Sequence, residues 1–261
     1  MQANVKLSTQ LFIYFLLAFL IAWGTWFPSF LHPKSLRLLS FVGLFAPAIS
    51  AIIVSFYYDK AKGIRELFGR FTRFRFGLLW YIIAILLMPF LFTLSFLLDG
   101  FLIQTSFNNI LLPTSPYFAL AAFIWLTFIN SGEEIGWKGF ALPRLQTLFK
   151  TPLAATLVLG ILWSTWHLPI YLTPGQSSFP VVLFFLFTVG LSFIYTVVFN
   201  KTTGSLFSAI LLHAATDVVP RVLNITLFKL TTWLILGILT WVRATVFIFT
   251  MKRSRRSFPV S

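Results

Sequence analysis

Residues 78–98 read LLWYIIAILLMPFLFTLSFLL, an apolar stretch without a charged side chain. A helix needs about 20 mainly apolar residues to cross a bilayer, so this stretch predicts a transmembrane helix. Stretches of the same kind occur at residues 11–30, 38–58, 117–130, 153–172, 181–199, 206–219 and 231–250. The sequence therefore predicts an all-α, polytopic transmembrane bundle of about eight helices, or seven if the short stretch 206–219 is re-entrant.

The composition agrees with a lipid environment. Of the 261 residues, 58% are hydrophobic and 10% are charged, and the mean hydropathy is +0.90. A soluble chain of this size cannot bury so much apolar surface in one core. No linker or internal repeat divides the chain, which indicates a single integral-membrane domain over 1–261. The absence of cysteine excludes disulfides and thiolate metal sites.

The formal net charge of +14 comes from short basic clusters between the apolar stretches. Such clusters are typical of cytoplasmic loops beside an anionic leaflet, and they argue against nucleic-acid binding. The residues expected on the cytoplasmic side are Lys6, the loop 60–75, Lys138, Arg144, Lys150, Lys201 and the tail with Lys252, Arg253, Arg255 and Arg256. We expect both termini in the cytoplasm and a multi-pass protein of a prokaryotic cell membrane. Residues 59–75 either form a short basic helix on the membrane surface or are a charged loop.

Ionisable residues inside the apolar stretches gather in three segments of the second half of the chain. These segments are 130–140 (NSGEEIGWKGF), 162–169 (LWSTWHLP) and 208–217 (SAILLHAATD). Ionisable groups at membrane depth are costly, and they usually face a cavity and mark function. The clustering indicates a functional site built from Glu133, Glu134, His167, His213 and Asp217. The alternative is a set of interfacial or buried pairs with a purely structural role.

Helical spacing separates the roles of the two adjacent glutamates. Neighbouring residues on a helix point about 100° apart, so Glu133 and Glu134 cannot share one role. Glu134 and Lys138 have the i, i+4 spacing of an ion pair. Glu133 is thereby left free for chemistry.

Each histidine of the three segments has a neighbour on its own helix face. His167 follows Trp163 by four residues, and Asp217 follows His213 by four residues. Histidine is the side chain best suited to general acid and base work near neutral pH, and a neighbouring carboxylate can orient its tautomer. His213 and Asp217 together could bind a metal or stabilise an oxyanion.

In this order, the three segments resemble the CPBP family, which comprises the type II CAAX prenyl proteases and the bacteriocin-processing or ABI proteins. The Glu-Glu-x-x-x-Arg motif of that family is similar to residues 133–138, its aromatic-x-x-x-His motif to 163–167, and its His-x-x-x-Asn motif to 213–217. The resemblance covers about 132–220, which we expect to be the catalytic core, while the part up to about 112 frames the cavity. The departures from the family pattern are Lys138 for Arg, Trp163 where Phe is common, and Asp217 for Asn.

The resemblance implies hydrolysis of peptide bonds in a membrane cavity, with a membrane-associated or prenylated CAAX-type peptide as substrate. Glu133 is then the general base on the attacking water, assisted by His167, while His213 with Asp217 behind it stabilises the oxyanion. A divalent metal such as zinc, held by Glu133, His167 and His213, and a metal-free mechanism are both open. Counting along the predicted spans separates Glu133 from His167, so the two meet only if a boundary is revised or a helix is tilted or re-entrant.

Two other functions compete with the protease. One is a catalytically silent relative that binds a membrane peptide, for example as an immunity protein. The other is a small transporter with an intramembrane proton relay, although the two related halves typical of transporters are missing from this sequence. The sequence also lacks the His-Glu-x-x-His motif of helical zinc proteases and the Gly-x-Ser-x-Gly motif of serine hydrolases. It does not predict an oligomeric state.

Overall fold

The computed structural model describes residues 2–32, 35–36, 38–103, 115–172, 181–222 and 230–253. Within these ranges the ordered elements are all helices. In chain order they are α1 (Gln2–Leu31), α2 (Leu39–Gly69), α3 (Leu78–Ile103), α4 (Pro116–Glu134), the π-helix η2 (Ile135–Ala141), α5 (Leu142–Phe149), α6 (Pro152–Trp166), α7 (Leu168–Leu172), α8 (Val181–Lys201), α9 (Leu206–Val222) and α10 (Leu230–Arg253). The predicted all-helical fold is confirmed.

Seven helical runs in the described part of the chain are long and apolar enough to cross a membrane. One of them combines α4, η2 and α5, and another combines α6 and α7. The predicted stretch 206–219 corresponds to α9, which has 17 residues. At 1.5 Å per residue α9 is roughly 25 Å long, less than the hydrocarbon core of about 30 Å. The described ranges thus contain seven candidate spans and the shorter helix α9, within the predicted range of seven to eight.

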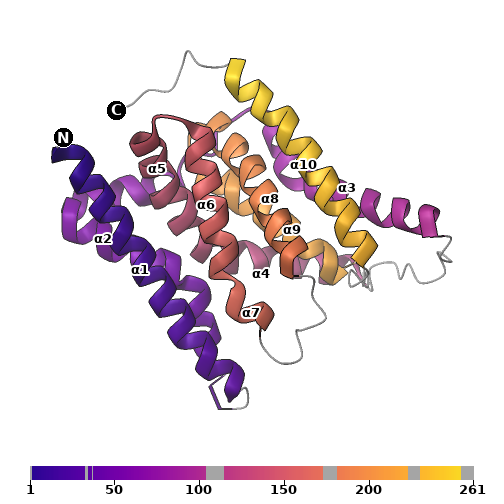
Figure 1. Ribbon diagram of the computed structural model, residues 1–261, viewed down its shortest axis with the longest axis horizontal. Coiled ribbons are helices and arrows are strands. Elements are labelled where there is room, and N and C mark those ends of the chain that lie inside the picture. Colours follow the sequence, from indigo (N-terminus) through magenta and orange to yellow (C-terminus); the bar gives the residue numbers. More distant parts are fainter. Residues whose placement is uncertain are drawn as a thin grey trace.

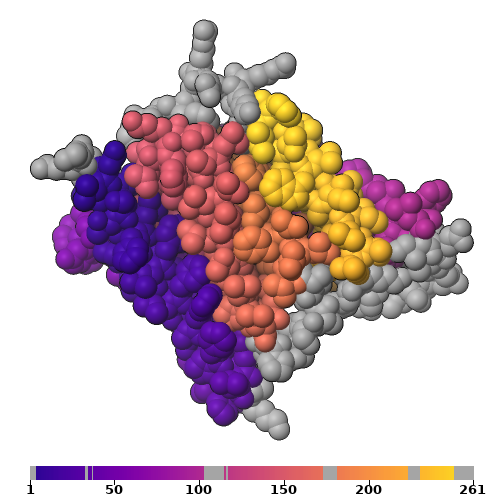
Figure 2. Space-filling view, viewed as in Figure 1, coloured from indigo at the N-terminus to yellow at the C-terminus, as the bar shows by residue number. Residues whose placement is uncertain are grey.

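The helices α6, α8 and α9 form the centre of the bundle (Figure 1). In Figure 1, α1 and α2 lie on one side, and α3 and α10 lie on the other, with α6, α8 and α9 between them. Residues 187–199 of α8 are all buried, which makes α8 a central helix. Side chains of α1, the α5–α6 region, α8 and α10 follow one another across the face seen in Figure 2. Large apolar side chains such as Phe90 on α3 and Val242 on α10 are exposed, as contact with lipid tails requires.

Polar contacts gather several of the basic segments at one end of the bundle. The Lys6 Nζ lies 3.3 Å from Asp59 Oδ1, and an Arg144 guanidinium nitrogen lies 3.4 Å from Asp59 Oδ2. At this end the Arg73 guanidinium donates a 2.7 Å hydrogen bond to the Thr203 carbonyl oxygen. These contacts join α1, the end of α2, α5 and the turn between α8 and α9. The side of the membrane on which this end lies stays a prediction.

Lys138 is an exception to the predicted distribution of positive charge. It was expected beside Arg144 on the cytoplasmic side, but its side chain is wholly buried inside the bundle. The reason is that the helical run does not end before Lys138 and instead continues to Phe149. The expectations for Arg255 and Arg256 lie outside the described residues, and so do those for the side chains of Lys252 and Arg253.

A short amphipathic helix follows the second span. Lys60 has φ 54° and ψ −143°, which divides α2 and sets residues 61–69 apart from the rest of the helix. Gly63 and Leu67 are buried there, whereas Lys62 and Arg65 are exposed. The helical alternative predicted for residues 59–75 is therefore confirmed over 61–69, and its location on a membrane surface stays a prediction.

Candidate active site

A helical hairpin brings the first two site segments together. The run from α4 through η2 to α5 ends at Lys150, which adopts the left-handed conformation with φ 54°. Thr151 then caps α6, because its side chain accepts a hydrogen bond from the Leu153 amide. From this turn α6 runs back along the bundle (Figure 1) and ends next to His167. His167 Nε2 lies 3.9 Å from Glu133 Oε2.

The predicted end of the fourth span at residue 130 was therefore wrong. Hydropathy drops after this point because Glu133, Glu134 and Lys138 follow, and the prediction took these charges for a membrane interface. In the structure all three side chains are buried and have partners inside the bundle. Extending the helix to residue 149 removes the predicted separation of Glu133 from His167.

Small residues allow α2 to approach η2 closely. A Cβ atom on Gly136 would lie 2.5 Å from the carbonyl carbon of Pro47, so only glycine fits at this contact. A Cβ atom on Gly139 would lie 3.1 Å from a methyl carbon of Leu67. Turns of π-helix occur frequently at functional sites, and η2 directly follows the two glutamates. The contact with α2 therefore holds the helix in place next to Glu133 and Glu134.

Glu133 faces the end of α6. Its Oε2 accepts a 2.7 Å hydrogen bond from the Trp163 indole N–H, and the same oxygen is the one that lies 3.9 Å from His167 Nε2. His167 Nδ1 lies 2.8 Å from the carbonyl oxygen of Trp163. Because a carbonyl oxygen only accepts, Nδ1 carries a proton, and a neutral His167 ring turns the lone pair of Nε2 toward Glu133.

Glu134 points to a different set of partners. Its Oε1 lies 2.9 Å from His213 Nδ1 on α9, and its Oε2 lies 3.5 Å from Lys138 Nζ. The ammonium group of Lys138 lies 4.4 Å from the ring centroid of Trp163 and 4.6 Å from that of Tyr195. Cations bind favourably over aromatic faces, so the two rings and the carboxylate together accommodate this buried charge. The predicted Glu134–Lys138 ion pair is confirmed.

Asp217 lies at the outer edge of the cluster. Its Oδ2 is 3.9 Å from His213 Nε2 and accepts a 3.2 Å hydrogen bond from the side-chain amide of Asn130. The Asp217 side chain is 33% exposed, compared with 7% for His213. His213 thus has a carboxylate opposite each ring nitrogen, one buried and one partly exposed.

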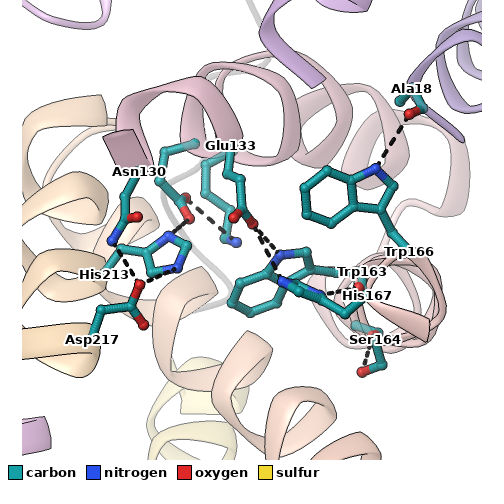
Figure 3. Close-up of polar contacts among 12 residues, drawn as sticks. Ala18, Asn130, Glu133, Trp163, Ser164, Trp166, His167, His213 and Asp217 are labelled. Carbon is teal, nitrogen blue, oxygen red and sulfur yellow. Dashed lines mark hydrogen bonds and ion pairs between the residues drawn. The ribbon is translucent and has the colours of Figure 1, made fainter. Parts of the chain in front are cut away.

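The structure brings all five predicted site residues into one cluster (Figure 3). The indole ring of Trp163 lies between the two histidines, with its centroid 5.8 Å from that of His167 and 5.6 Å from that of His213. Sequence reasoning missed the parts played by Asn130 and Tyr195. Asn130 sits one helical turn before Glu133, a spacing that could have indicated it. Tyr195 lies in an apolar stretch and gives no such signal.

The arrangement of donors does not fit the metal site that was considered. Among the described residues, no group of three or more His, Asp and Glu side chains is spaced to hold a metal ion. Both nitrogens of His213, the third ligand that was considered, already face carboxylates. We therefore assign no catalytic step to a metal.

Two comparisons with known proteins bear on the class of this protein. Residues 113–219 match the family model of Rce1-like type II CAAX prenyl endopeptidases, a range that contains all five predicted site residues. The CAAX prenyl protease 2 of Methanococcus maripaludis is similar to this chain, with 28% identity over 92% of the chain and 94% of the relative. With the buried Glu–His cluster, these matches indicate a hydrolase of the intramembrane endopeptidase class. Both matches agree with the resemblance of the three motifs to the CPBP family.

Proposed function

We propose that this protein hydrolyses a peptide bond near the C-terminus of a membrane-associated peptide, with prenylated CAAX-type peptides as its substrate class. The observation that carries the proposal is the contact between Glu133 Oε2 and His167 Nε2, which face each other at 3.9 Å in a buried site. Two acceptors in this arrangement suit one molecule that donates to both. Water is such a molecule, and it is also the nucleophile of hydrolysis.

The first step is activation of the attacking water. A water molecule within hydrogen-bond reach of both groups donates one proton to Glu133 Oε2 and the other to His167 Nε2. Its oxygen lone pairs then point away from the two bases, toward a substrate carbonyl. Glu133 takes up the proton as the water attacks, and the same group can deliver it to the leaving amine. This mechanism is complete without a metal.

The second requirement is stabilisation of the oxyanion. His213 has Glu134 opposite Nδ1 and Asp217 opposite Nε2, an arrangement that lets both nitrogens act as donors. Its Nε2 side is the more open one, because Asp217 is partly exposed. We assign this nitrogen the role of donating to the tetrahedral oxyanion. Glu134 then orients the His213 ring.

The substrate class follows from the relatives and from the surroundings of the site. The matching family and the archaeal relative are named for cleavage of CAAX prenyl substrates. The site lies within apolar helices, and a prenyl chain gives a peptide affinity for the membrane that surrounds them. We place the end of the bundle with Lys6, Asp59 and Arg144 in the cytoplasm, following the excess of basic residues there.

The test is cleavage by the purified protein in detergent or liposomes. Quenched fluorescent CAAX peptides are supplied with and without a farnesyl group, and mass spectrometry identifies the bond that is cut. We expect cleavage of the farnesylated peptide by the wild type and loss of cleavage in Glu133→Ala. Binding of this peptide without any cleaved product would favour a silent binding protein. Transport of a solute into liposomes without cleavage would favour a transporter.

A further inference from the structure

We propose that Trp163 is a positioning residue whose indole N–H holds the Glu133 carboxylate in its working orientation. The inference rests on the proposed role of Glu133 and adds a residue to it. The hydrogen bond from Trp163 Nε1 reaches Glu133 Oε2, the same oxygen that faces His167. The indole of Trp163 therefore fixes this oxygen in a position where it faces His167.

Burial strengthens the hydrogen bond between Trp163 and Glu133. The exposed fraction is 2% for Trp163 and 5% for Glu133, so this hydrogen bond lies away from bulk solvent. A hydrogen bond to a charged acceptor in such surroundings is stronger than one between neutral groups. Without it, the carboxylate is free to rotate away from His167.

Other buried indoles in the bundle bind different acceptors. The indole N–H of Trp26 donates to the Ser40 carbonyl oxygen, and that of Trp166 donates to the Ala18 carbonyl oxygen. Both of these bonds tie a side chain to the backbone of a helix. Trp163 instead donates to the side chain of a proposed catalytic residue, which points to a role in the site.

The rest of the Trp163 ring has contacts that a phenyl ring can partly keep. Its face covers the Lys138 ammonium group, and its edges contact the rings of His167 and His213. Phenylalanine provides an aromatic ring at this position but no donor. Trp163→Phe is therefore a selective change, because it removes the hydrogen bond to Glu133 and leaves an aromatic side chain in place.

The kinetic test compares Trp163→Phe with Trp26→Phe on the farnesylated CAAX peptide. Both variants lose a buried indole donor, but Trp26 does not contact the Glu–His cluster and serves as the matched control. We expect kcat to fall about ten- to a hundredfold in Trp163→Phe with KM unchanged, as loss of a charge-assisted hydrogen bond predicts. In Trp26→Phe we expect kcat to stay at the wild-type value while the melting temperature falls. Unchanged kcat in Trp163→Phe, beside an inactive Glu133→Ala, would overturn the positioning role and leave the proposed function intact.

A second measurement does not depend on activity. The protein has nine tryptophans, so selective ¹⁵N labelling gives a small set of indole signals, and Trp163→Phe identifies the signal of Trp163 by its loss. We expect Glu133→Ala to move the indole proton signal of Trp163 upfield and to leave that of Trp26 in place. A Trp163 signal that does not move in Glu133→Ala would overturn the inference, whether or not a cleaved substrate has been found.

Discussion

The two acid–histidine pairs of the site are built from adjacent glutamates and yet differ in almost every respect. In the open pair, Glu133 and His167 face each other at 3.9 Å without a direct hydrogen bond. In the closed pair, Glu134 and His213 are 2.9 Å apart, and Lys138 lies on the other side of the carboxylate. The open pair has room for a shared donor, whereas the closed pair already has its partners.

The difference follows from helix geometry. Consecutive side chains point about 100° apart, so Glu133 turns to α6 while Glu134 turns to α9 and to Lys138 one turn ahead. Buried polar groups are normally satisfied, and a pair of acceptors left facing each other marks a place for a ligand or a reacting molecule. We therefore propose that the open pair performs the chemistry and that the closed pair supports it.

The largest effect is expected from changes to the open pair. Glu133→Gln or His167→Ala should lower kcat by about 10²- to 10⁴-fold, the usual contribution of a general base. Because both groups act on the same water, the double variant should be no slower than the slower single variant. Single-turnover cleavage of the farnesylated peptide measures this. Losses that multiply in the double variant would show that the two residues act in separate steps.

A change to the closed pair should mainly lower stability. Glu134→Gln leaves the Lys138 ammonium group buried without its carboxylate, which costs about 3–5 kcal/mol in the free energy of unfolding. Glu134→Gln combined with Lys138→Met removes both charges and should recover most of this loss. Thermal unfolding in detergent measures it, with Glu133→Gln as the comparison. A melting temperature that is equal in Glu134→Gln and the wild type would remove the distinction between the pairs.

A smaller effect is expected at the outer edge of the closed pair. Asp217 is partly exposed and 3.9 Å from His213, so solvent screens its charge. Asp217→Asn keeps the shape of the side chain, and we expect kcat/KM to change by no more than about fivefold. A loss as large as that of Glu133→Gln would instead assign Asp217 a direct part in catalysis.

The smallest effect is expected from chelators. The mechanism assigned to the open pair uses water activated by Glu133 and His167 and involves no metal. Cleavage should therefore continue after incubation with EDTA or 1,10-phenanthroline, and elemental analysis should find no stoichiometric zinc. Activity that is lost on chelation and restored by added zinc would favour a metal-dependent mechanism.

Much of this arrangement is local and can be predicted from the sequence. Long apolar stretches predict membrane helices because the cost of burying polar groups in lipid applies to each segment separately. The Glu134–Lys138 pair is also local, because the two residues are four apart in one continuous helical run, and so it could be predicted. The five residues that cluster in the structure could be selected from the sequence because ionisable side chains are rare in such stretches.

The rest depends on contacts between helices that are distant in sequence. The aromatic rings next to the Lys138 ammonium group belong to Trp163 on α6 and Tyr195 on α8. Nothing near Lys138 in the sequence therefore predicts that its charge can be buried. The end of the fourth span was predicted wrongly for this reason, because the sequence near Lys138 does not show that its charge is buried. Asn130 acquires its role only when α9 brings Asp217 beside it.

The role of Glu133 as the base that activates water is tested most directly by cleavage of the farnesylated CAAX peptide by wild type and Glu133→Gln. Both proteins are prepared in the same way, and equal melting temperatures establish that both are folded. We predict a single cleaved bond near the C-terminus with the wild type and at least about a hundredfold slower cleavage with the variant. Equal rates of cleavage by the two proteins would contradict the assignment of the open pair as the catalytic centre.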